Sequence, residues 1–135
     1  MPSEVVLAVL TRIDEERGLA VQEIHGDLST EEILEAQREL YVDRAFDPAK
    51  PCLWDATEGN VAAAMTGREM QTAASRGSAL WDRMAGGRTA ILVARESDFG
   101  MGRMYELMAK DMPRELKVFR DRDEALAWLF GSAAE

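Results

Sequence analysis

The stretch Glu115-Leu-Lys-Val-Phe-Arg-Asp-Arg-Asp-Glu-Ala-Leu-Ala-Trp-Leu129 decides the fold. Its first part alternates apolar and polar residues, which predicts a short strand over Leu116–Phe119. Asp121 follows, with Glu124 three residues later, a spacing typical of a helix N-terminus. The apolar residues beyond it share one face of the expected helix: Ala125, Trp128 and Leu129. The end of the chain therefore predicts a strand followed by a helix that buries Trp128 against the sheet.

Two similar units precede this one. A short buried strand is expected over Cys52–Ala56, followed by a long helix over Thr66–Met84 that opens with a capping box. Thr89–Ala94 is apolar without alternation, as in a central strand that is covered on both faces. The helix after that strand is expected over Phe99–Met112, since Pro113 cannot continue it.

The amino-terminal part predicts a hairpin and a helix. Val5–Ile13 and Leu19–Gly26 are expected to be its strands, joined by the turn Asp14–Gly18, where glycine supplies a positive φ. Ser29–Glu32 is a capping box that opens a helix, and Phe46–Pro51 cannot be helical because of its two prolines.

The elements thus follow one another as β-β-α-β-α-β-α-β-α. Strands that are joined by helices return parallel to one another. This order predicts the α/β class and a single mixed sheet whose first strand is antiparallel and whose other strands are mainly parallel. One domain is expected over residues 1–135, with a core at about 4–130 and a short C-terminal tail.

Composition excludes several classes of function. The 135 residues carry a net charge of −9, which argues against nucleic acid as a partner. No apolar run is long enough to span a bilayer, so no integral membrane segment is expected. Cys52 is the only cysteine, and the first residues do not read as a signal peptide, so a cytoplasmic location is expected.

The chain resembles a known family. The order of elements, with Gly26-Asp27-Leu28 after the second strand, is similar to STAS domains, and above all to the SpoIIAA-like branch of uncharacterised small bacterial proteins. The residues that carry this resemblance are Asp55, the helix-opening Phe99, Gly100 and Arg103, and the ending Phe119, Ala125, Trp128 and Leu129. The resemblance implies a regulatory or ligand-binding module, and this branch has been likened to CRAL-TRIO lipid carriers.

Asp55-Ala-Thr-Glu-Gly59 lies where STAS antagonists carry Asp-Ser-Ser-Gly, so the resemblance places Thr57 at the position of the phosphorylated serine. Ala56 replaces the first serine, however, and Glu58 precedes the glycine. A phosphate beside Glu58 would suffer like-charge repulsion. The segment is therefore interpreted as a polar loop, with Asp55 accepting turn amides, rather than as a phosphorylation switch.

Catalytic and metal sites are not indicated. His25 is the only histidine, and Ser29 is better used as a helix cap than as its nucleophile. One histidine and one cysteine cannot assemble a structural zinc site, and the acidic pairs fit no calcium loop. We expect no enzyme activity, no cofactor and no metal.

A ligand-binding hypothesis rests on the segment Ser97–Arg103. Free amides, two glycines and Arg103 in one helix opening could hold an anion. Methionines at helical spacing could line an adaptable apolar pocket, although they more often fill a core. The candidate ligand-binding residues are Asp55, Met70, Gly100, Gly102, Arg103, Met104, Tyr105 and Met108.

Two functions remain open. The first is a non-enzymatic STAS-like regulatory module that binds a protein partner or forms a homodimer. The alternative is a carrier or sensor of a small amphipathic anion, with its tail between the second and third helices and its head near Gly100 and Arg103.

Overall fold

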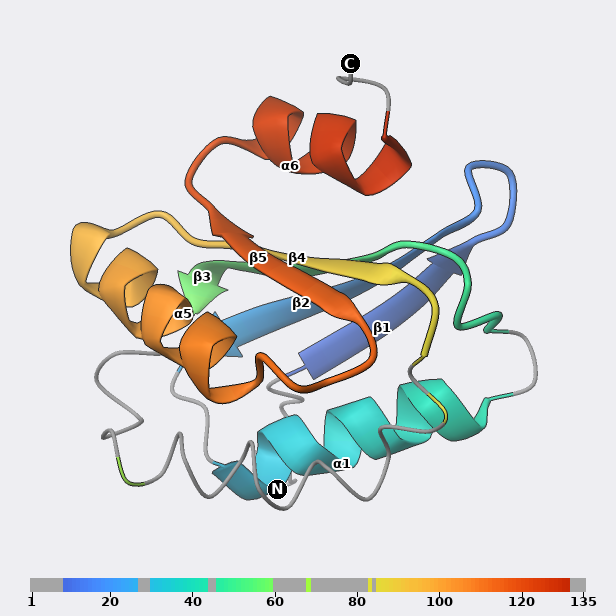
Figure 1. Ribbon diagram of the computed structural model, residues 1–135, viewed down its shortest axis with the longest axis horizontal. Helices are drawn as coiled ribbons and strands as arrows, with labels where there is room; N and C mark the ends of the chain where they lie inside the picture. Colours follow the sequence, from blue (N-terminus) through green and yellow to red (C-terminus); the bar gives the residue numbers. More distant parts are fainter. Residues whose placement is uncertain are drawn as a thin grey trace, which may run out of the picture.

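A computed structural model describes residues 9–26, 30–43, 46–59, 68, 83 and 85–131. Within these ranges five strands form one sheet in the order β1-β2-β3-β4-β5 (Figure 1). β1 (Val9–Asp14) pairs antiparallel with β2 (Leu19–Gly26), and the other strands run parallel to β2: β3 (Cys52–Gly59), β4 (Arg88–Leu92) and β5 (Glu115–Phe119). The predicted mixed sheet and α/β class are confirmed.

Helices cover both faces of this sheet. α1 (Thr30–Val42) and α5 (Glu96–Met108) lie on one face, and α6 (Arg122–Phe130) lies on the other (Figure 1). Because both faces are covered, successive residues of the central strands are buried in different layers. Trp54 packs in the α1/α5 layer, whereas its neighbour Leu53 packs in the α6 layer.

The last strand and helix form as the sequence predicts. The Asp121 carboxylate accepts hydrogen bonds from the amides of Asp123 and Glu124, and Gly131 ends α6 in the left-handed conformation with φ of 67°.

Trp128 packs against the core of the α6 layer, as predicted, but it is only partly buried. Ala125 and Leu129 are buried, but Trp128 is half-buried at the rim of the α6 layer. Its ring centroid lies 5.5 Å from that of Phe119, and the guanidinium carbon of Arg88 lies 5.1 Å from the Trp128 centroid.

The third strand is longer than predicted. It continues to Gly59, so that Asp55 lies inside β3 and does not end it. Glu23 of β2 pairs with Asp55, and His25 pairs with Glu58, so two steps along β2 are matched by three along β3. This bulge accommodates the polar segment within the strand, where the sequence had indicated a loop.

The helix after β4 begins and ends earlier than predicted. α5 starts at Glu96 instead of Phe99 and stops at Met108 instead of Met112. Glu96 and Asp98 lie in its first turn, where carboxylates interact favourably with the helix dipole. Gly100 and Gly102 therefore lie inside α5 and do not form an open helix start.

Several predicted features fall outside the described residues. These are most of the helix expected over Thr66–Met84, including Met70, and the capping residue Ser29.

Gly102 and Gly100 provide a matched test of the packing between α5 and β5. A Cβ added at Gly102 would lie 2.5 Å from Cγ2 of the buried Val118, whereas one added at Gly100 would meet nothing within 4 Å. Gly102→Ala should destabilise the protein by about 1–3 kcal/mol through overpacking. Gly100→Ala should stabilise it by up to about 1 kcal/mol, since alanine favours helix. Urea unfolding measures both, and a stabilising Gly102→Ala would contradict the packing.

Candidate functional site

One candidate site lies toward the carboxyl ends of β2 and β3. A hollow of about 230 Å³ is lined there by Glu23, His25, Asp55, Thr57, Glu58 and Arg122. The β3 bulge and the start of α6 bring these side chains together, although they come from distant parts of the sequence. Ligands of open α/β sheets favour this end of the strands.

Asp55 is the centre of this carboxyl-end site. Its Oδ1 accepts hydrogen bonds from the Thr57 hydroxyl at 2.6 Å and from the Thr57 amide at 3.1 Å. Its Oδ2 forms an ion pair with Arg122. Burial alone would raise the pKa of Asp55, but the bonds from Thr57 and Arg122 outweigh it and hold the pKa below its ordinary value.

The carboxyl-end site does not form a catalytic triad among the described residues. His25 Nε2 lies 3.6 Å from Glu23 Oε1, and no hydrogen bond joins His25 to Thr57 or Asp55. Burial raises the pKa of the Cys52 thiol to about 12, so this thiol is protonated at neutral pH. Within the described ranges no three metal-ligating side chains cluster, and no helix is long and apolar enough to cross a membrane.

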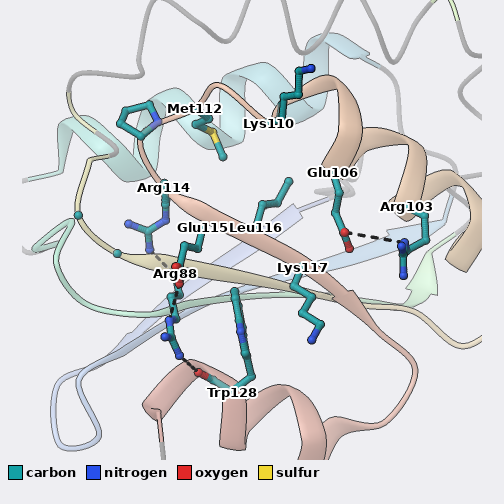
Figure 2. A pocket seen from close by; sticks show the side chains of 14 residues that line it. Arg88, Arg103, Glu106, Lys110, Met112, Arg114, Glu115, Leu116, Lys117 and Trp128 are labelled. Carbon is teal, nitrogen blue, oxygen red and sulfur yellow. Dashed lines mark hydrogen bonds and ion pairs between the residues drawn. The ribbon is translucent and has the colours of Figure 1, made fainter. Parts of the chain in front are cut away.

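A second and larger candidate site follows the outer edge of β5. This β5 groove has a volume of about 880 Å³ and runs between α5 and α6 (Figure 2). Its charged lining consists of five cationic and two acidic side chains: Arg88, Arg103, Lys110, Arg114 and Lys117 with Glu106 and Glu115. The groove is therefore cationic on a chain whose net charge is −9.

The cations of the β5 groove differ in their partners. Arg88 donates to Glu115 at 2.7 Å and to the Trp128 carbonyl, and Arg103 lies 3.8 Å from Glu106. Lys110 and Lys117 are exposed and form no ion pair within the described part of the chain. Lys117 Nζ lies 5.4 Å from the Phe119 ring centroid, and the charges of both lysines could pair with an anionic partner.

Glu106 also contacts the strand itself. Its Oε2 accepts a hydrogen bond of 2.6 Å from the Val118 amide, on the side of β5 that faces away from β4. A side chain thus occupies a backbone donor that would otherwise pair with a further strand.

The structure separates the candidate ligand-binding residues of the sequence analysis. Arg103 lines the β5 groove, and Met104 is exposed. Tyr105 and Met108 instead pack against the core of the α1/α5 layer, and burial raises the pKa of the Tyr105 hydroxyl. Gly102 contacts Val118, and Asp55 belongs to the carboxyl-end site.

Two buried polar atoms of the α1/α5 layer lack hydrogen-bond partners within the described ranges. They are Gln22 Oε1 and Trp54 Nε1. The two residues are register partners on β2 and β3, so their side chains leave the sheet on the same face. The Gln22 amide nitrogen is occupied, since it donates to Thr11 and to the carbonyl of Ala36. An unpaired acceptor and an unpaired donor thus lie on neighbouring strands.

Sequence reasoning missed Glu106, Lys110, Arg114 and Lys117. Lys117 had a usable signal, because a lysine that interrupts an apolar strand is typical of a sheet edge. Glu106 had none, since its role depends on how α5 packs beside β5.

No protein-family model matches the chain, and no curated protein matches it. A solved structure is similar to it, that of an uncharacterised protein of the DUF3478 family with a SpoIIAA-like fold from Shewanella loihica PV-4. The likeness has a TM-score of 0.58, covers 96% of this chain and 98% of that chain, and has 21% sequence identity. The chain has a SpoIIAA-like fold. At this identity the likeness shows the fold alone.

Thr57 is the residue for which the sequence resemblance raised a phosphorylation hypothesis. In the structure the Thr57 hydroxyl donates to Asp55. A phosphate would break that bond and would lie near the carboxylates of Asp55 and Glu58.

Because the pKa of Asp55 is lowered in the folded protein, the difference in stability between the wild type and Asp55→Asn should depend on pH. Asp55→Asn should lower the free energy of unfolding by about 1 kcal/mol at pH 7, since hydrogen bonds to a carboxylate are lost. The folded pKa of Asp55 lies below its ordinary value of 3.8, so this stabilisation is present above pH 3.8 and disappears as the pH falls through the folded pKa. Unfolding curves from pH 7 to pH 2 measure it, with the exposed Glu58→Gln as control. A difference that does not shrink on acidification would refute the assignment.

Thr57 should remain unphosphorylated in the native host. Phosphopeptide mapping of protein that is purified from that host tests this directly. Substantial phosphate on Thr57 would contradict the prediction and would favour a STAS antagonist function.

Proposed function

We propose that this protein is a non-enzymatic, cytoplasmic regulatory module that acts by binding another protein through the β5 groove. The single observation that carries the proposal is the volume of about 880 Å³ along an edge strand, lined by charged side chains from both flanking layers. The β5 groove is larger than the hollow at the carboxyl-end site, which has a volume of about 230 Å³.

The character of the β5 groove favours a macromolecular partner. Sites for small molecules are usually enclosed and mostly apolar. The β5 groove is instead open and charged, and it follows a strand whose outer edge faces no other strand in the described sheet. Complementary charge across such a surface contributes to specificity and to the rate of association.

The carboxyl-end site supports the non-enzymatic part of the proposal. A hydroxyl nucleophile needs a base that takes up its proton. Thr57 does donate to Asp55, but the ion pair with Arg122 and the lowered pKa make this carboxylate a weak base.

One observation favours a second candidate, the binding of a small amphipathic molecule. An unpaired buried polar group costs about 1–3 kcal/mol. A ligand hydroxyl or carboxyl group could donate to Gln22 Oε1, and a ligand oxygen could accept from Trp54 Nε1. Native mass spectrometry separates the two candidates, because it reports a retained protein and a retained small molecule as different masses.

The β5 groove can be tested by charge reversal. Lys110→Glu combined with Lys117→Glu should weaken the complex with the host partner by roughly tenfold or more, since two cations become anions. The control is Arg38→Glu on α1, because Arg38 is also exposed but lies outside the groove. The measurement is native mass spectrometry of tagged protein purified from the host.

Three results would contradict the proposal. One is a partner that the double variant retains as well as the wild type does. Another is a homodimer, with no other protein bound, that persists in the double lysine variant as well as in the Arg38→Glu control. The third is a retained small molecule with no retained protein, which would support the amphiphile candidate instead.

A further inference from the structure

Two residues of β5 direct their backbone groups away from β4, where a further strand could pair with them. The amide of Glu115 donates to Gly87, and the carbonyl of Phe119 accepts from Val93, so both groups point toward β4. Alternate residues of a strand direct their backbone groups to opposite edges. Leu116 and Val118 therefore present their N–H and C=O groups to the β5 groove.

Glu106 occupies the place that a neighbouring strand would take. Its carboxylate holds the Val118 amide at 2.6 Å, and its side chain is only 19% exposed. A carbonyl oxygen of an added strand would lie in the same position relative to this amide. Glu106 thus protects the edge against unspecific pairing, and it can be displaced without unfolding any strand.

Both walls of the β5 groove are cationic. Arg103 and Lys110 project from α5 and from the turn that follows it, whereas Arg88 and Lys117 lie on the α6 side (Figure 2). The side chains of an added strand alternate between the two walls. Acidic residues on both faces of the added segment would then meet cations. A second copy of β5 has a single carboxylate, that of Glu115, beside the cation of Lys117, so it complements this lining less well than an acidic segment does.

We propose that an extended acidic peptide segment of a partner protein adds to β5 as a sixth strand and displaces Glu106 from the Val118 amide. This inference rests on the proposed function, because it specifies what the β5 groove binds. Backbone pairing supplies the affinity, and the cationic walls select acidic sequences.

The test uses the full chain and a fluorescent peptide, acetyl-Glu-Val-Glu-Glu-Val-Glu-amide, with its dissociation constant measured by anisotropy. Glu106→Ala should tighten binding by about fivefold, since no side chain then has to be displaced. Glu115→Ala is the matched control, because it removes the same charge from the groove without freeing an edge amide. Its effect should be clearly smaller.

Two N-methylated peptides distinguish strand pairing from attraction between charges. In each peptide every second amide is methylated, and the two peptides carry the methyl groups on opposite sets. In one peptide the methyl groups therefore block the edge that would pair with β5, and in the other they lie on the opposite edge. One peptide should bind about tenfold more weakly and the other nearly as well as the parent. Equal binding of the two methylated peptides would overturn strand addition. The proposed function would still stand in that case if the double variant, Lys110→Glu with Lys117→Glu, releases the host partner.

Two further outcomes are decisive. If Glu106→Ala dimerises in sedimentation experiments without peptide, the edge belongs to a second copy and the acidic-peptide inference fails. If neither the peptide nor the host partner responds to charge reversal in the groove, the proposed function fails with it.

Discussion

The guanidinium of Arg114 is buried at the amino-terminal end of the parallel strands, and the position of β5 depends on its hydrogen bonds. The guanidinium donates to the Thr89 hydroxyl and to the carbonyls of Pro48, Lys50 and Arg88. It therefore joins the segment before β3 and the start of β4 to the start of β5. A buried cation is tolerated only when its donors are satisfied, so these segments have little freedom to shift. The start of β5, the last strand of the described sheet, is thereby anchored beside β4.

The β5 groove follows from this arrangement. Both faces of the sheet are covered, so within the described residues its backbone groups are left for a partner at the edge strands, and β5 is the edge strand that borders the groove. The close contact between Gly102 and Val118 brings α5 near enough to β5 for Glu106 to reach the Val118 amide. α5 therefore shapes the groove, contributes Arg103 to its wall and, through Glu106, protects its edge.

Local signals predicted much of the fold. β2 matches the expected Leu19–Gly26, and the Asp121 cap is as predicted, because each depends on residues that are close in sequence. The errors at β3 and α5 arise from tertiary structure. Asp55–Gly59 has the composition of a loop, yet pairing with β2 through a bulge keeps it in the sheet. The candidate site was harder to predict, since the hydrogen bond between Glu106 and Val118 joins two elements whose packing the sequence does not reveal.

The outer edge of β5 faces no other strand in the described sheet, and Glu106 holds the Val118 amide on it. Amide hydrogen exchange of the free protein tests this most directly, because Leu116 and Val118 both face that edge. The Val118 amide should exchange roughly tenfold or more slowly than the Leu116 amide, and Glu106→Ala should remove the difference. Strong protection of both amides in the wild type and in the variant would instead show that another part of the chain already covers this edge.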